Sequence, residues 1–137
     1  MFKRSRKSNP PLASSDISAK TLGDLAEQLA CDWLVKRGLV LKDRNFRTQY
    51  GEIDLIMQRD DCLIFVEVRY RKNSNYGSAE ESITANKCQR FKAAAQGYLL
   101  AKGYDSNTPI KFDVLAISPS SEPHLHYTMN WIQNILS

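Results

Sequence analysis

The sequence predicts a single α/β domain with a mixed central sheet flanked by helices, in the order α-β-β-β-α-β-β. Two segments carry apolar residues at helical spacing, the first over residues 18–37 and the second ending at Gly103. Short runs of branched and aromatic residues lie between these helices and after the second one. The 137 residues are enough for one core that buries about two thirds of the unfolded surface. We therefore predict one domain over residues 18–137, preceded by a disordered basic leader at residues 1–17.

The first helix is predicted from a single apolar stripe. Lys36 and Arg37 suit the negative end of its dipole, and Gly38 suits a left-handed cap. Glu27 lies at the margin of the stripe, where it is either a boundary carboxylate held by solvent or a nearby arginine, or a third acid directed at the sheet. The stripe consists of Leu22, Leu25, Ala26, Leu29, Ala30, Trp33 and Leu34.

The remaining elements follow from apolar runs and turn residues. The second helix has two plausible starts, at Ser78 and at Thr84, since each begins a capping pattern. A short polar turn between the second and third strands favours a hairpin. Strands are predicted at residues 39–46, 52–58, 63–71, 111–117 and 125–129, with a short terminal segment at 131–133.

Two carboxylates interrupt runs that otherwise indicate buried strands. Asp54 lies among apolar residues of the second strand, and Glu67 follows the apolar run of the third. Burying an ionised carboxylate without a partner costs several kcal/mol or more, so each needs a cation, a cluster of donors or a raised pKa. A hairpin brings the two acids side by side, which is the arrangement of a site for a hard cation. Glu52 shares strand parity with Asp54 and either joins this site or pairs with Arg47 or Arg44.

The charge distribution bears on partners and location. The formal net charge of +4 equals the contribution of Lys3, Arg4, Arg6 and Lys7, because basic and acidic residues balance in the rest of the chain. This leader either attracts phosphate backbones or is simply solvated. No apolar run approaches the ~20 residues of a membrane helix, and the basic start lacks the apolar region of a secretory signal. The odd number of widely spaced cysteines indicates neither a disulfide framework nor a zinc site, so we expect a cytoplasmic protein.

The motifs resemble those of the YraN-like proteins, a family within the PD-(D/E)XK nuclease superfamily that is related to archaeal Holliday-junction resolvases. The resemblance covers about residues 18 to 133 and implies a restriction-endonuclease-like core with a phosphodiesterase site for Mg²⁺ or Mn²⁺. By motif position, Asp54 and Glu67 resemble the metal ligands, helped by the Val68 carbonyl, and Glu27 resembles the helical acid. The blocks that carry the resemblance are Gly23-Asp24-Leu25-Ala26-Glu27, Asn45-Phe46-Arg47, Gly51-Glu52-Ile53-Asp54-Leu55-Ile56, Phe65-Val66-Glu67-Val68-Arg69-Tyr70-Arg71, Thr84-x-x-Lys87 and Lys111-Phe112-Asp113-Val114.

Arg69 departs from the superfamily pattern because it occupies the place of a lysine. Strand alternation puts Glu67 and Arg69 on one face. A guanidinium cannot act as a base, although it can bind a scissile phosphate with two parallel hydrogen bonds. Three alternatives stay open: metal-bound hydroxide attacks with Arg69 as a phosphate clamp, Lys87 or Lys72 supplies the ammonium, or catalysis is lost and only binding remains.

Two functional hypotheses lead from these residues. The first is a metal-dependent endonuclease acting on branched or structured DNA, for which a homodimer stays open because such substrates have two scissile strands. The second is a nucleic-acid-binding protein on the same fold without cleavage. In both cases the expected contacts to the nucleic-acid backbone are Arg47, Arg71, Lys72, Lys87 and Arg90.

Overall fold

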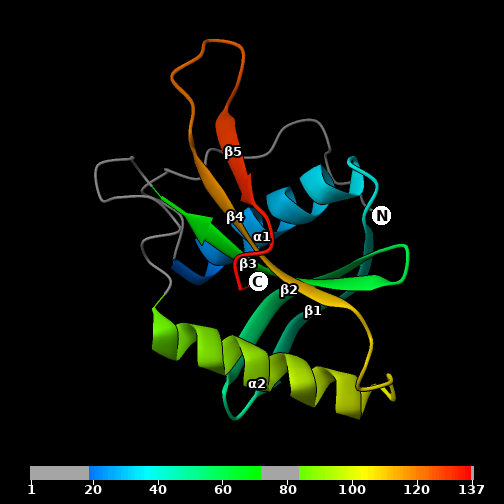
Figure 1. Ribbon diagram of the computed structural model, residues 1–137. Coiled ribbons are helices and arrows are strands. Elements are labelled where there is room, and N and C mark those ends of the chain that lie inside the picture. Colours follow the sequence, from blue (N-terminus) through cyan, green and yellow to red (C-terminus); the bar gives the residue numbers. More distant parts are fainter. Residues whose placement is uncertain (1–18, 72–83, 137) are drawn as a thin grey trace, which may run out of the picture.

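The computed structural model of the chain describes residues 19–71 and 84–136. The predicted leader at residues 1–17, the start of a helix at Ser78 and the candidate Lys72 lie outside these residues. The element order is the predicted α-β-β-β-α-β-β, which confirms the fold class (Figure 1). The elements are α1 (Ala19–Val35), β1 (Val40–Thr48), β2 (Gly51–Arg59), β3 (Cys62–Tyr70), α2 (Ala85–Ala101), β4 (Ile110–Pro119) and β5 (Tyr127–Ile132).

The strands form one mixed sheet in the spatial order β1-β2-β3-β4-β5. The β3–β4 pair is parallel and the other three pairs are antiparallel. Parallel neighbours need a crossover connection, and the chain from β3 to β4 includes α2. A five-stranded mixed sheet with helices on it is consistent with a restriction-endonuclease-like core.

The two helices cover opposite faces of the sheet. Alternate residues of β2 and β3 divide between two buried clusters, so that Met57 and Ile64 pack with α1 while Ile56 and Phe65 pack with α2. The predicted apolar stripe of the first helix lies entirely in the α1 cluster, either buried or packed against it. The core therefore has two layers, one on each side of the sheet, and Figure 1 shows α2 running across the β1–β2 hairpin.

The observed ends of the elements differ from the predicted ones by a few residues. Thr84 caps α2, since its side chain accepts a hydrogen bond from the backbone N–H of Lys87. Gly38 has φ +97°, so it forms the left-handed cap that was predicted for the first helix. The terminal segment is part of β5, because Trp131 pairs with Leu115 of β4 and so continues the ladder.

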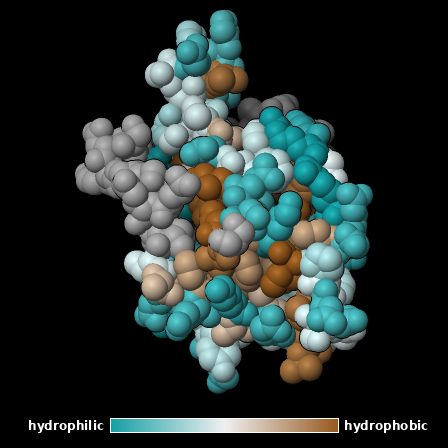
Figure 2. Space-filling model, viewed as in Figure 1, coloured by the Kyte–Doolittle hydropathy of each residue, from teal (hydrophilic) through white to brown (hydrophobic). Residues whose placement is uncertain are grey.

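The connection between β4 and β5 projects away from the rest of the molecule (Figure 1). Its surface in the view of Figure 2 is largely hydrophilic, although the side chain of Leu125 is 57% exposed. No helix among residues 19–71 and 84–136 has the length and apolar character needed to cross a membrane.

Asp113 is the one charged side chain that is buried among the described residues, with 1% of it exposed. One of its carboxylate oxygens accepts a hydrogen bond from Trp131 Nε1 at 2.8 Å, and the other accepts one from the backbone N–H of Asn134 at 2.8 Å. Burial raises the pKa of this carboxyl, while the two donors act in the opposite direction. Asp113 thus ties β5 and the residues that follow it to the interior strand β4.

An Asp113→Ala variant should therefore be less stable. The substitution removes the acceptor of two part-buried hydrogen bonds, and the loss of each such bond costs about 0.5 to 1.5 kcal/mol. Urea denaturation followed by circular dichroism should show a lower midpoint with an unchanged slope. Asp61→Ala, at an exposed residue of the β2–β3 turn, is the control and should leave the midpoint in place. Equal midpoints for both variants would contradict the role given to Asp113.

Candidate functional site

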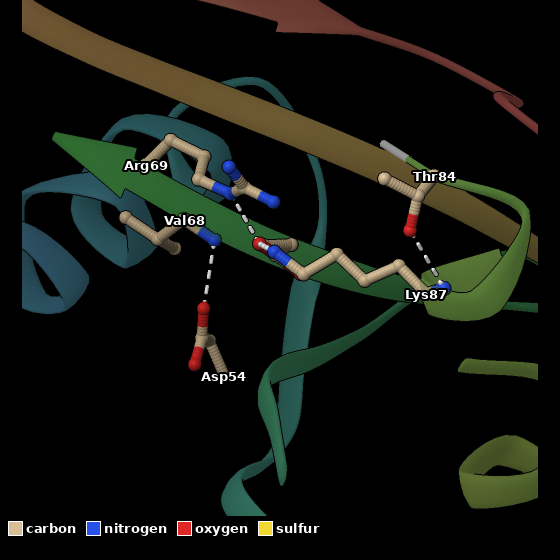
Figure 3. Close-up of polar contacts among 6 residues, drawn as sticks. Asp54, Val68, Arg69, Thr84 and Lys87 are labelled. Atoms are coloured by element: carbon tan, nitrogen blue, oxygen red, sulfur yellow. Dashed lines mark hydrogen bonds and ion pairs between the residues drawn. The ribbon is translucent and has the colours of Figure 1, made fainter. Parts of the chain in front are cut away.

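Asp54 and Glu67 lie where strands β2 and β3 begin to separate. Leu55 and Val66 form the last pair of the β2–β3 ladder on this side, and Asp54 and Glu67 are the next residues along each strand. Beyond that pair the two strands are joined by a side chain and not by backbone pairing. Asp54 Oδ2 accepts a hydrogen bond from the backbone N–H of Val68 at 2.8 Å (Figure 3). The predicted hairpin therefore brings the two acids to the same place in the sheet.

The carboxyl of Asp54 lies in an unfavourable environment for its ionised form. Burial is the largest influence on it, and the negative charges of Glu27, Glu67 and Glu52 add to that influence. Together they raise the pKa of Asp54 to about 7, against the opposing effect of the Val68 N–H. Acids gathered at a cost in stability are typical of functional sites. Asp54 is the centre of this acidic group.

Glu27 reaches the group from α1 and is held there by a residue of β1. Asn45 Nδ2 donates a hydrogen bond to Glu27 Oε1 at 2.8 Å. Asn45 has φ +53°, a conformation that is uncommon for residues other than glycine. The ladder pairs its neighbours Arg44 and Phe46 with Leu55 and Ile53, which places Asn45 across from Asp54. An irregular residue of β1 therefore holds Glu27 close to the strand that carries Asp54.

Glu67 is engaged by two cations, Arg69 and Lys87. Its Oε2 pairs with Arg69 Nε and lies 3.2 Å from Lys87 Nζ. Arg69 comes from the same strand, as alternation predicted, whereas Lys87 extends from the first turn of α2 (Figure 3). Only 13% of the Glu67 side chain is exposed, so the two cations neutralise a largely buried carboxylate. An ammonium is thus present beside the second acid, although the strand position is an arginine.

A pocket of about 150 Å³ opens next to Glu67, between the turn of the β1–β2 hairpin and the first turns of α2. We call it the hairpin–helix pocket. The helix contributes residues at positions i, i+3, i+4 and i+7, which is one face of α2. The lining includes the side chains of Tyr50, Glu52, Glu67, Lys87, Arg90 and Phe91.

The other predicted site residues have varied places. Arg47 is exposed and its Nε lies 3.5 Å from Glu52 Oε2, so the alternative in which Glu52 pairs with an arginine is the one observed. Arg90 lines the hairpin–helix pocket. Arg71 is half-buried, and its backbone N–H donates to the carbonyl of Ile117. Val68 contributes the N–H that bonds Asp54.

The site offers carboxylate oxygens to a divalent cation, but it is not a preformed site with three or more protein ligands among the described residues. No three His, Cys, Asp or Glu side chains within residues 19–71 and 84–136 are grouped closely enough to hold a metal ion. Mg²⁺ keeps several of its waters and is usually bound through one or two carboxylates, so it does not need such a group. Asp54 and Glu67, repelling each other in a buried place, are ligands of a kind that fits this ion.

Two contributors to the site were not predicted from the sequence. Asn45 belongs to a motif block that carries the family resemblance, but a polar residue in a strand gave no reason to expect its bond to Glu27. Tyr50 lies in a turn and is 47% exposed, and its place beside α2 depends on how the helix crosses the hairpin. The sequence pointed to Asn45 only through its place in the motif block Asn45-Phe46-Arg47, and it held no feature that pointed to Tyr50.

Comparison with known proteins places the chain in a family. Residues 26–117 match the model of "Uncharacterised protein family UPF0102". A UPF0102 protein of Nitrosococcus oceani is 50% identical over 96 residues, which cover 70% of this chain and 77% of that protein. A UPF0102 protein of Vibrio parahaemolyticus is 40% identical over 120 residues, covering 88% and 95%. A third, from Nitrosomonas europaea, is 41% identical over 117 residues, covering 85% and 94%.

The matched region runs from α1 to β4 and so contains Glu27, Asp54, Glu67 and Lys87. The YraN-like part of the expected resemblance corresponds to this match. By the extent of the family match and by these relatives, the chain belongs to the UPF0102 family.

Proposed function

We propose that this chain is a divalent-metal-dependent nuclease of the PD-(D/E)XK type, which hydrolyses phosphodiester bonds in branched or otherwise structured DNA. The observation that carries the proposal is the 3.2 Å contact between Lys87 Nζ and Glu67 Oε2, beside Asp54. It places an ammonium next to the second acid, where the superfamily pattern has a strand lysine and this chain has Arg69. The choice of branched DNA comes from the resemblance to junction resolvases.

The metal would be Mg²⁺ or Mn²⁺, with Asp54 and Glu67 as its protein ligands. When bound, such an ion supplies a polarised phosphoryl oxygen and an activated water. The carbonyl of Val68 is the further ligand that the family resemblance implies, and Glu27 would act through a water. Mutual repulsion of the acids, which contributes to the raised pKa of Asp54, is what supports this assignment.

The chain's own cations would hold the substrate. Arg69 can bind a phosphate with two parallel hydrogen bonds, and Lys87 adds a compact charge that stabilises the developing negative charge at phosphorus. Arg90, at the pocket, and the exposed Arg47 would contact flanking phosphates. Binding that depends on such contacts weakens steeply as the salt concentration rises.

A second candidate is a nucleic-acid-binding protein that does not cleave. The observation in its favour is that Arg69 and Lys87 already neutralise Glu67. A carboxylate that is held by two cations is a weaker ligand for a third. In this case the same basic residues would bind the nucleic acid, and the acids would only position them.

Cleavage of branched DNA separates these two candidates. With Mn²⁺ the purified chain should cut a labelled four-way or flapped DNA, and EDTA should stop the reaction. Glu67→Ala should lower the rate by at least about a hundredfold, because a metal ligand and a partner of both cations are lost. Glu122→Ala, at an exposed residue before β5, is the matched control and should cut like the unmodified chain.

Each other outcome of this experiment has a definite meaning. Cleavage that persists in Glu67→Ala would come from a contaminating nuclease and would remove the first candidate. Binding without cleavage, with an affinity that falls steeply in salt, would favour the second. If no branched or single-stranded DNA is bound even at low salt, both are wrong.

A further inference from the structure

The hairpin–helix pocket has the size of one aromatic ring. Its volume is about 150 Å³. An enclosed apolar cavity of about this volume holds a benzene molecule, so a single six-membered ring matches the pocket more closely than a two-ring system. The pocket opens beside Glu67, which the proposed function makes a metal ligand of the cleavage site.

Two aromatic side chains line this pocket, Tyr50 from the hairpin turn and Phe91 from α2. Tyr50 is 47% exposed, which is high for such a large apolar ring. Its turn is braced by Thr48, whose hydroxyl accepts from the backbone N–H of Tyr50 at 3.0 Å and donates to the carbonyl of Gly51 at 3.1 Å. Gly51 has φ +138°, which a residue with a side chain rarely adopts. Phe91 lines the pocket from α2.

The charged side chains of the pocket suit a ligand that carries both a phosphate and a polar ring. Arg90 lines the pocket and is exposed, so its guanidinium can contact a phosphate at the pocket mouth. Lys87 stands on the same face of α2. Glu52 and Glu67 provide acceptors at the wall. Aromatic walls suit a flat ring, the acceptors suit the polar edge of that ring, and the cations suit an attached anion. A nucleotide combines these three features.

We infer that the hairpin–helix pocket binds the base of one unpaired pyrimidine nucleotide, stacked against Tyr50 and Phe91, with an adjoining phosphate on Arg90. The base must be unpaired because a paired base lies inside its stack and cannot enter a pocket. The place of this base beside a cleaved phosphate rests on the proposed function, whereas the binding itself needs no metal. The chain would thus prefer DNA in which a single-stranded pyrimidine adjoins a duplex or branch.

Fluorescence anisotropy in EDTA tests the inference with the full chain and without cleavage. Three labelled single strands of equal length and charge serve as probes: oligothymidylate, oligodeoxyadenylate and a strand of abasic deoxyribose phosphates. Stacking of a base on an aromatic side chain is worth about 1 to 3 kcal/mol. We expect oligothymidylate to bind at least about fivefold more tightly than the abasic strand, and more tightly than the purine strand.

Tyr50→Ala should reduce the affinity for oligothymidylate to that for the abasic strand. Because Tyr50 lies at an exposed turn, this variant should keep its circular dichroism spectrum. Leu125→Ala is the matched control, since it removes an exposed apolar side chain far along the sequence from the pocket, and should preserve the preference. Equal affinity of the unmodified chain for oligothymidylate and the abasic strand would overturn the inference, as would a preference that survives in Tyr50→Ala.

The Arg90→Gln variant separates the contribution of the phosphate contact to binding from that of the base contact. It should lower the affinity for all three strands by a similar factor and reduce the salt dependence of binding, while the preference for oligothymidylate remains. Lys92→Gln, an exposed residue of the same helix that does not line the pocket, should have a smaller effect. Loss of the base preference in Arg90→Gln would contradict the assigned roles. If branched DNA is not cleaved but the preference for pyrimidine strands holds, the proposed function fails and the pocket inference stands.

Discussion

Replacing Asp54 by asparagine is expected to stabilise the folded chain while reducing metal-dependent cleavage by at least about a thousandfold. The stabilisation follows from the environment of the carboxylate, which is partly buried and close to three other acids. An asparagine has nearly the same shape, and its amide oxygen can still accept the Val68 N–H. It carries no charge, however, and therefore removes the repulsion. A gain in stability with a loss of activity is the pattern expected of a functional residue.

The gain should depend on pH in a defined direction. The folded-state pKa of Asp54 is about 7, above the value of 3.8 for an unperturbed aspartate, so the folded chain binds this proton more tightly than the unfolded chain. The stability of the unmodified chain therefore falls as pH rises from about 4 to 7, and levels off above that range. We expect Asp54→Asn to be more stable by about 1 to 3 kcal/mol at pH 8, and to lose this advantage near pH 4.

Thermal unfolding in EDTA over a series of pH values measures this effect. A difference of that size corresponds to a rise in Tm of roughly 5 to 10 °C at pH 8. Addition of Mn²⁺ should raise the Tm of the unmodified chain and leave that of Asp54→Asn in place, because a ligand stabilises only the state that binds it. Asp61→Asn, at an exposed turn, serves as the control for charge alone. A lower Tm for Asp54→Asn at pH 8 would mean that Asp54 is an ordinary structural residue.

The second large effect is expected at Lys87. Lys87→Ala removes the ammonium next to Glu67 and should reduce cleavage by about a hundredfold or more, since preorganised charges at a transition state contribute that much. Arg69→Lys alone should change the rate little, because Lys87 already supplies an ammonium. The combination of both substitutions is the informative variant: a lysine on the strand should restore part of the activity that Lys87→Ala has lost.

Single-turnover cleavage rates at saturating Mn²⁺ give the comparison, with DNA affinity measured separately in EDTA. Lys92→Ala, on the same helix but away from the pocket, is the control for the loss of a positive charge. Rescue by Arg69→Lys in the Lys87→Ala background would show that the ammonium, and not its origin in the chain, is needed. Unchanged cleavage in Lys87→Ala would remove the observation on which the proposed function depends.

The fold was predictable because its signals are local. The helical stripe of α1 and the polar hairpin turn each lie within a short segment, and both were confirmed. Thr84, one of the two helix starts that the sequence left open, is the observed cap of α2. The ends of β5 were not predicted. The pairing of Trp131 with Leu115 joins residues that are far apart in the sequence, so no local pattern reports it.

The candidate site was predictable only in part. Asp54 and Glu67 stood out because carboxylates in apolar runs are costly, and the hairpin register followed from the turn. The sequence left open whether Lys87 or Lys72 replaces the missing strand lysine, since the answer depends on the path of α2 over the sheet. The structure places Lys87 at Glu67. The contact of Asn45 with Glu27 is equally non-local, as it joins β1 to α1.

The Glu67 carboxylate and the Lys87 ammonium come from different elements, and this bears on when the site is complete during folding of a new chain. The acid belongs to the sheet, whereas the ammonium arrives with a helix from a different layer that is packed by its own cluster of apolar residues. A nascent or partly unfolded chain whose helix has not yet docked carries the acids without this ammonium. Under the proposed function such a chain would be nearly inert toward DNA, and hydrolytic competence would arise only once α2 has packed on the sheet.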